Sequence, residues 1–234
     1  QAKHNFLVLG TGCGLLSMFI NKTMHPMFAR LNTVDIDEEM VSVGKEYFGF
    51  SADSTKNFRS EIADAREYLK SYELPGKVNA LFIDLSSQEF DETQIPPKVL
   101  LSDEFFESIN RVLDPDHHVV CYNSLAYTKS TMHEINKYMN TKFKHVSYMR
   151  VEESQNVIYV MSNSHAPNLT KTSEKTVKYF VKTFCDPLNA DGFNWAHEMK
   201  IAHFLDGIKY NEGNKAQVEV EVVENSDAKK KKPK

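Results

Sequence analysis

The stretch FLVLGTGCGLL, residues 6–16, decides the fold class, because an apolar strand runs directly into a glycine-rich loop that opens a helix. The apolar run predicts a strand over residues 6–9, and the pattern after the loop predicts a helix over residues 15–22. A loop of small residues lets the backbone approach a ligand closely, and the start of a helix offers free N–H groups. Three glycines make up this loop: Gly10, Gly12 and Gly14. The loop alone is weak evidence for a cofactor, since structural turns have similar sequences.

Apolar strands and amphipathic helices alternate through the first two-thirds of the chain. Six further strands are expected, at residues 30–35, 58–62, 78–84, 118–123, 145–150 and 157–161. Helices are expected between them, at residues 38–48, 65–72, 102–112 and 130–140. We therefore predict an α/β fold, a doubly wound Rossmann-like sheet of seven strands that is mostly parallel, ends in an antiparallel hairpin and is followed by C-terminal helices.

The last third of the chain has a different pattern. Two more helices are expected, at residues 174–184 and 195–205, so one domain should extend over residues 1–208 with a helical part from about residue 166. Residues 209–234 are interpreted as a mostly disordered tail that ends in a lysine run. The chain begins at Gln1, without a methionine and almost directly on a strand, so we expect it to be a fragment of a longer protein.

Charge is unevenly spread along the chain. There are 28 basic and 32 acidic side chains, and five of the bases lie in the final run: Lys229, Lys230, Lys231, Lys232 and Lys234. Without them, 23 bases face 32 acids, a net charge of −9. An acidic body disfavours specific or non-specific binding of nucleic acid and suits a basic protein partner. The lysine run is interpreted as a solvated tail, with a nuclear signal or a nucleic-acid tether as alternatives.

Composition limits the cellular setting. The three cysteines, Cys13, Cys121 and Cys185, form neither a disulfide framework nor a pair with zinc-ligand spacing. There is no signal peptide and no apolar run long enough to span a bilayer. We expect a cytoplasmic protein without membrane or metal, with nuclear entry through the lysine run as the alternative.

Acidic residues close three successive predicted strands after the glycine loop. Asp35 ends the second strand, at the distance from the loop where such folds carry a carboxylate that accepts the two ribose hydroxyls. Ile36 follows it, and Asp37 is expected to cap the next helix. The alternative is that both acids are helix caps.

The third and fourth strands end in Asp64 and Asp84. Asp64, followed by Ala65, would accept a hydrogen bond from an adenine amino group, although a helix cap explains it equally well. Asp84 would face the reacting centre. Nicotinamide dinucleotide is the competing cofactor, but the loop has GxGxG spacing instead of GxGxxG. The set of three acids favours S-adenosyl-L-methionine.

Several blocks carry a resemblance to a known family: FLVLGTGCGLLSMFI, VDIDEEMVSVGKEYFGF, IADAREYL and ALFIDLSSQEF. They resemble the class I S-adenosylmethionine-dependent methyltransferases with a spermidine-synthase-like fold. Among these, they are most similar to the C-terminal domain of the elongation factor 1-alpha lysine and N-terminal methyltransferases (the methyltransferase-like 13 family). The similarity extends through residues 95–97, 122–125, 150–153 and 156–160, reaches residues 192–195 more weakly, and covers roughly residues 4–208.

The resemblance implies a function and a set of site residues. It implies methyl transfer to the N-terminal α-amine of elongation factor 1-alpha, with a lysine as the alternative target. Cofactor binding falls on Gly10, Gly12, Gly14, Asp35, Ile36, Asp64, Ala65 and Asp84, and catalysis on Asp84 and Asn156. Ser86 stands where the family is expected to have a second acid.

Two other functions stay open. Spermidine-synthase-like aminopropyltransferases share the fold, but their catalytic block is acid-rich after the fourth strand, whereas here it continues as Leu85-Ser86-Ser87. A catalytically inactive domain that binds cofactor or a partner is the third reading, and Ser86 is the residue that keeps it open. By analogy with aminopropyltransferases, a homodimer is also expected.

Overall fold

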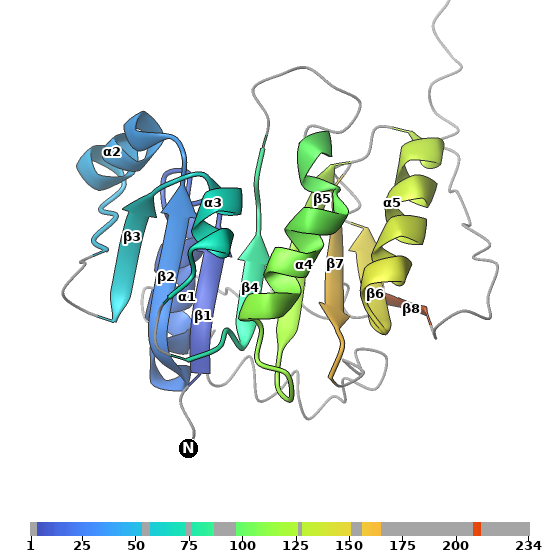
Figure 1. Ribbon diagram of the computed structural model, residues 1–234. Coiled ribbons are helices and arrows are strands. Elements are labelled where there is room, and N and C mark those ends of the chain that lie inside the picture. Colours follow the sequence, from blue (N-terminus) through green and yellow to red (C-terminus); the bar gives the residue numbers. More distant parts are fainter. Residues whose placement is uncertain are drawn as a thin grey trace, which may run out of the picture.

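The computed structural model describes residues 4–52, 57–73, 76–86, 97–125, 128–150, 156–164 and 208–211. Its centre is an eight-stranded sheet with the order β3-β2-β1-β4-β5-β7-β6-β8 (Figure 1). The strands are β1 (His4–Leu9), β2 (Phe28–Asp35), β3 (Phe58–Ile62), β4 (Ala80–Ile83), β5 (Val119–Leu125), β6 (His145–Arg150), β7 (Asn156–Ser162) and β8 (Ile208–Asn211). All seven predicted strands are present, with ends that differ by one or two residues.

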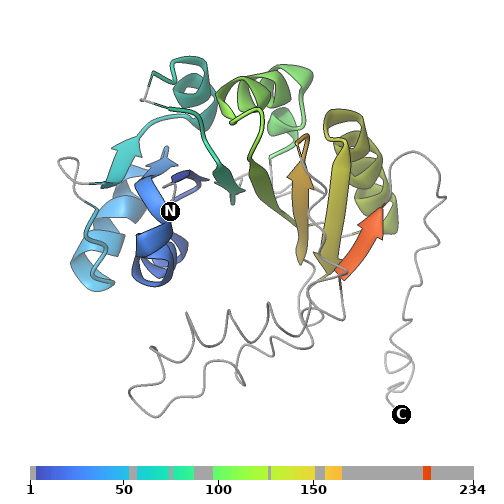
Figure 2. The ribbon, with the colours of Figure 1, turned by 90° about the horizontal axis from the view of Figure 1, so that it is seen from below.

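Helices cover both faces of the sheet, as the alternating pattern predicts. Figure 2 shows α3, α4 and α5 on one side and α1 and α2 on the other. The helices are α1 (Leu15–Met24), α2 (Glu38–Tyr47), α3 (Ala65–Lys70), α4 (Asp103–Val112) and α5 (Lys129–Lys142), with two 3-10 turns, η1 (His25–Met27) and η2 (Lys98–Leu100). The doubly wound α/β prediction is confirmed.

Five neighbouring strands, from β3 to β5, are parallel. Strand β7 inserts between β5 and β6 and is antiparallel to both, so the predicted final hairpin supplies one reversed strand inside the sheet. Because parallel strands all end at the same edge, the loops that follow β1, β2, β3 and β4 converge there. That edge is where ligands bind in open α/β sheets.

An eighth strand was not predicted from the sequence. Residues Ile208–Asn211 pair antiparallel with β6, across the boundary that we expected at residue 208 between domain and tail. The segment is short and follows a pattern that we interpreted as helical, so local periodicity carried no strand signal. The helices expected at 174–184 and 195–205 lie outside the described residues, as does the lysine run.

Two apolar clusters, one on each face, hold the layers together. The larger one packs α3, α4 and α5 against the sheet around the fully buried side chains of Phe106, Tyr122 and Tyr159. The smaller one packs α1 and α2 around Phe28 and Leu31. Strands β1 and β4 contribute alternate residues to the two clusters, which explains why their sequences are almost continuously apolar.

Candidate functional site

The register of the sheet aligns the ends of β1, β2 and β4 with the middle of β5 at one edge. Leu9 of β1 lies opposite Val34 of β2 and Ile83 of β4, and Ile83 lies opposite Tyr122 of β5. The N–H of Gly10 donates to the oxygen of Val34 and that of Asp84 to the oxygen of Leu9, so the next residue of each strand joins a single row across the edge. This row, named the edge row below, consists of Asp35, Gly10, Asp84 and Asn123. It brings two predicted carboxylates and a predicted glycine into one line.

The glycine loop leaves no room for larger residues at two of its positions. A Cβ atom on Gly10, whose φ is 94°, would lie 2.0 Å from the backbone oxygen of Asp84. A Cβ atom on Gly14, whose φ is 86°, would lie 2.3 Å from the ring of Phe50. At Gly12 no other atom lies within 4 Å of such a Cβ. The loop therefore packs closely against the residue after β4 and against Phe50, and it is open at Gly12. We call this loop, residues 10–14, the glycine cradle.

Helix α1 begins at this cradle without a side-chain cap. Gly14 occupies the cap position, and no acidic residue lies in the first turn. The first N–H groups of the helix therefore lack the usual side-chain acceptor. Such an end attracts the carboxylate or hydroxyl oxygens of a ligand.

Asp35 connects the end of β2 to the glycine loop. Its Oδ2 accepts a hydrogen bond of 2.7 Å from the backbone N–H of Gly12, and its Oδ1 accepts one of 2.9 Å from the N–H of Asp37. Asp37 in turn caps α2 by accepting from the N–H of Met40 at 3.0 Å. The expected division between a strand-ending Asp35 and a capping Asp37 is confirmed. Each Asp35 oxygen keeps a second lone pair for a ligand hydroxyl.

Beside Asp35, two apolar side chains extend from the ends of neighbouring strands. Ile36 is 69% exposed and Ile62 is 46% exposed, which is unusual for isoleucine. Ile62 lies opposite Asp35 in the β2–β3 register. An exposed apolar pair next to the predicted ribose acid would suit the flat face of an adenine ring.

Asp64 caps α3 and forms an ion pair. Its Oδ1 accepts from the backbone N–H of Arg66 at 2.8 Å, and its Oδ2 lies 2.6 Å from the guanidinium of the same residue. The hydrogen bond from the Arg66 side chain is the main cause that holds the pKa of Asp64 below its usual range. The cap reading is confirmed, and adenine binding by Asp64 stays a prediction. Ala65, which follows, is buried.

Asp84 lies exposed directly after β4, and it forms hydrogen bonds with residues of both neighbouring strands, β1 and β5. Its backbone N–H donates to the oxygen of Leu9 at 2.8 Å, and its side-chain Oδ1 accepts from the Nδ2 of Asn123 at 2.8 Å. Asn156 begins β7 opposite Leu125 and therefore lies diagonally across from Asn123 on the same face of the sheet. The two residues predicted to be catalytic thus come from strands on either side of Asn123.

Sequence reasoning missed Asn123 as a site residue. The signal was a polar residue at the end of the strand predicted at residues 118–123, three strands after the one that ends in Asp35. The register that places it beside Asp84 is a tertiary property. It also missed the buried hydroxyl pair of Thr11 and Thr33, which are hydrogen-bonded to each other and attach the loop to β2.

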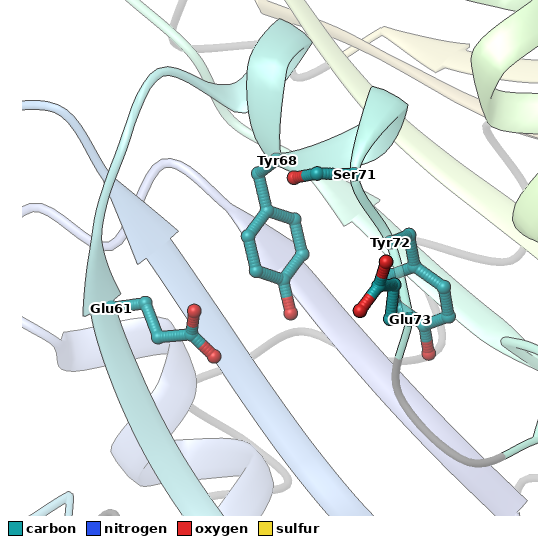
Figure 3. Close-up of a pocket in the computed structure, with 5 residues that line it drawn as sticks. All are labelled: Glu61, Tyr68, Ser71, Tyr72 and Glu73. Carbon is teal, nitrogen blue, oxygen red and sulfur yellow. The ribbon is translucent and has the colours of Figure 1, made fainter.

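A separate pocket of about 200 Å³ lies between β3 and α3. Figure 3 shows the rings of Tyr68 and Tyr72 with the carboxylates of Glu61 and Glu73 beside them. Burial, with the nearby Glu61 charge as the second cause, raises the pKa of Tyr68. The lining contains no residue of the edge row, so this pocket is not the predicted cofactor site. Within the described ranges, no helix is long and apolar enough to cross a membrane, and no group of His, Cys, Asp and Glu side chains is arranged to hold a metal ion.

Comparison with known protein families gives one match that covers most of the chain. The model of the spermine/spermidine synthase domain matches residues 1–173. Two curated relatives are named eEF1A lysine and N-terminal methyltransferase. The mouse protein is 30% identical over 115 residues and the human one 28% over 119 residues. Each match covers 47% of this chain and 16% of the relative, so the chain spans a small part of those proteins.

Solved structures share the fold. Human methyltransferase-like protein 13 in complex with SAH is 20% identical, with a TM-score of 0.65, over 78% of this chain and 80% of that one. Spermidine synthase from Thermotoga maritima is 16% identical, with a TM-score of 0.60, over 86% of this chain and 65% of that one. Both likenesses support the Rossmann-like architecture described above.

Proposed function

The chain belongs to the spermine/spermidine synthase domain family. From its similarity to curated methyltransferases that act on eEF1A, we propose that it is an S-adenosylmethionine-dependent protein methyltransferase. We propose that its substrate is the N-terminal α-amine of an elongation factor 1-alpha-like protein, with a lysine amine as a further target. The observation that carries the proposal is the edge row, because it places a ribose-type acid, a glycine cradle and an exposed carboxylate in one line.

The residues of this edge fit S-adenosylmethionine. The open space at Gly12 leaves room for the cofactor to approach the loop closely. The lone pairs left on Asp35 suit the two ribose hydroxyls of the cofactor. Ile36 and Ile62 would contact the adenine, with Asp64 at the amino group. Asp84 would then lie near the methionine end, two positions along the row from the ribose acid.

Methyl transfer requires the protein mainly to orient the amine toward the methyl group of the cofactor. When bound, S-adenosylmethionine supplies a methyl group on a positively charged sulfur. The amine nitrogen attacks that carbon in line, the C–S bond breaks, S-adenosylhomocysteine leaves, and the amine loses a proton. An α-amine has a pKa of about 7.7–8.0, so a useful fraction is neutral at cellular pH. Asp84 orients the amine and accepts its proton, and the side chain of Asn156 helps to hold the amine in place.

The substrate class rests on charge and on the relatives. The curated relatives are named for activity on eEF1A, and the body of this chain is acidic, which favours a basic protein partner. A cytoplasmic location agrees with such a substrate.

The test is transfer of a radiolabelled methyl group to a peptide with the N-terminal sequence of elongation factor 1-alpha. The wild-type chain should label the peptide, and blocking its α-amine by acetylation should abolish labelling. Asp84→Ala should lower the rate by about 100-fold or more. Asp116→Ala is the matched control, since it removes an exposed aspartate at the opposite edge of the sheet. Equal rates for Asp84→Ala and wild type would contradict the assignment.

Family membership favours one second candidate, aminopropyl transfer to a polyamine. Incubation with putrescine and the decarboxylated cofactor distinguishes it, because a spermidine product requires that activity. The block Asp84-Leu85-Ser86 has one acid where aminopropyltransferases are acid-rich, so we expect no spermidine. Tight cofactor binding without transfer to peptide or polyamine would instead identify a binding domain.

A further inference from the structure

We infer that Asn123 is a second acceptor for the substrate amine and the residue that positions Asp84, an assignment that rests on the proposed function. The two side chains meet across β4 and β5, where the Nδ2 of Asn123 donates to the Oδ1 of Asp84 at 2.8 Å. They are neighbours in the edge row, although 39 positions separate them in the chain.

The chemistry of this contact sets the orientation of the Asn123 amide. A carboxylate only accepts hydrogen bonds, so the NH2 group of Asn123 must face Asp84 and its carbonyl oxygen must face away. That oxygen, Oδ1, is buried and forms no hydrogen bond with any residue in the described part of the chain. A buried acceptor without a partner is costly, and we assign the missing donor to the substrate amine.

The surroundings identify the kind of donor. Asp84 is exposed beside this oxygen, and Asn156, the first residue of β7, lies diagonally opposite Asn123 on the same face of the sheet. A neutral primary amine has two N–H groups and one lone pair. With one N–H on Asp84 and the other on Asn123, the lone pair would be left free to attack the methyl carbon. Each methyl transfer then replaces one N–H, so the nucleophile carries two, one and finally no N–H groups.

The number of N–H groups on the amine therefore distinguishes an acceptor role of Asn123 from a purely structural one. An acceptor on Asn123 matters when the amine still has an N–H to give it, and not for a dimethylated amine. The peptides to compare are therefore the unmethylated and the dimethylated elongation factor 1-alpha N-terminus. Two quantities should be measured, the kcat and KM of methyl transfer and the Kd of each peptide for the protein saturated with S-adenosylhomocysteine.

Asn123→Leu removes both the donor and the acceptor. For the unmethylated peptide it should lower kcat/KM about 100-fold, because the amine loses an acceptor and Asp84 loses the hydrogen bond that positions it. For the dimethylated peptide the loss of kcat/KM should be about tenfold smaller, because this amine has no N–H to donate and one hydrogen bond is worth about a factor of ten. The Kd of S-adenosylhomocysteine should stay within about twofold of wild type. Asn123→Asp keeps an acceptor oxygen but cannot donate to Asp84, so it should slow both peptides while leaving their ratio close to that of wild type.

Asn79→Leu is the matched control, since Asn79 joins strands at the opposite edge, where its Nδ2 donates to the backbone of His117 at 2.9 Å. It should change neither peptide's kinetics. If Asn123→Leu slows both peptides equally, or neither, while the wild type is active, the acceptor role of Asn123 is wrong and the proposed function stands. If the wild type transfers no methyl group, the proposed function fails. The peptide Kd values then decide on Asn123: weaker binding of the unmethylated peptide alone upholds its acceptor role, and unchanged binding overturns it.

Discussion

The carboxylate of Asp35 accepts a hydrogen bond of 2.7 Å from the backbone N–H of Gly12, 23 positions earlier in the chain. Its other oxygen accepts from the N–H of Asp37 at 2.9 Å. One side chain therefore fixes both the glycine loop and the start of the turn into α2. A ligand that binds the same carboxylate is coupled to the shape of the loop, and this coupling makes several outcomes testable.

Asp35→Ala should weaken S-adenosylhomocysteine binding by about tenfold or more, because it removes the ribose acceptor and releases the Gly12 N–H together. Isothermal titration calorimetry measures this directly. Asp37→Ala is the control: it should cost about 1 kcal/mol of stability as a lost helix cap and leave the affinity unchanged. Unchanged affinity in Asp35→Ala would remove Asp35 from the cofactor site.

Two glycine substitutions should separate folding from binding. Gly10→Ala places a methyl group 2.0 Å from the backbone of Asp84 at a positive φ, so it should lower the free energy of unfolding by about 3 kcal/mol. Gly12→Ala meets no other atom within 4 Å and should cost about 1 kcal/mol of backbone strain. It should nonetheless reduce cofactor affinity, because the methyl group occupies the cradle. Urea denaturation and calorimetry give the two quantities, and full affinity in Gly12→Ala would place the cofactor elsewhere.

The Asp64–Arg66 pair should contribute stability that depends on pH. The pKa of Asp64 in the folded protein lies below its ordinary value of 3.8, chiefly because the Arg66 side chain donates to it. The contribution is therefore complete above about pH 4 and is lost as the pH falls through the lowered folded-state value. The difference in Tm between wild type and Arg66→Ala should shrink from pH 6 to pH 3. Because both side chains are partly exposed, added salt should also reduce it, and a difference that grows on acidification would contradict the assignment.

Phe106 should be a dominant contributor to the larger core cluster. It is fully buried, and its ring centroid lies 5.6 Å from that of Tyr138 and 6.1 Å from that of Tyr122. Phe106→Ala should destabilise the fold by about 3–5 kcal/mol, measured by chemical denaturation. Phe48→Ala, which truncates a half-exposed ring, should cost much less. Similar costs for the two variants would mean that the cluster tolerates the cavity.

Ser86→Asp should raise the rate of methyl transfer. Ser86 is exposed two residues after Asp84, where the family resemblance implies a second acid. A carboxylate there would add an acceptor for the amine proton, for which a gain of about tenfold or more is reasonable. Ser86→Ala should behave like wild type. No difference between the two variants would show that Asp84 and its neighbours suffice for the proton.

Much of the fold could be predicted because local patterns carry it. The alternation of apolar strands with amphipathic helices, and the glycine loop after residues 6–9, specified the doubly wound class and seven strands. Asp37 was expected as a helix cap, and its side chain accepts a hydrogen bond from the first turn of α2. Strand β8 escaped prediction because four residues that pair at a sheet edge leave little periodicity in the sequence.

The sequence by itself determined which chemical groups end the strands: Asp35, Asp64 and Asp84 each follow a predicted strand, and the glycine loop precedes them all. What only the tertiary structure decided is which of these groups are neighbours. Backbone hydrogen bonds between strands set a register that aligns Asp35, Gly10, Asp84 and Asn123, while Asp64 lies beyond the end of β3 and is engaged by Arg66. Register depends on hydrogen bonds between segments far apart in the chain, so no local pattern contains it, and Asn123 became visible as a site residue only through it.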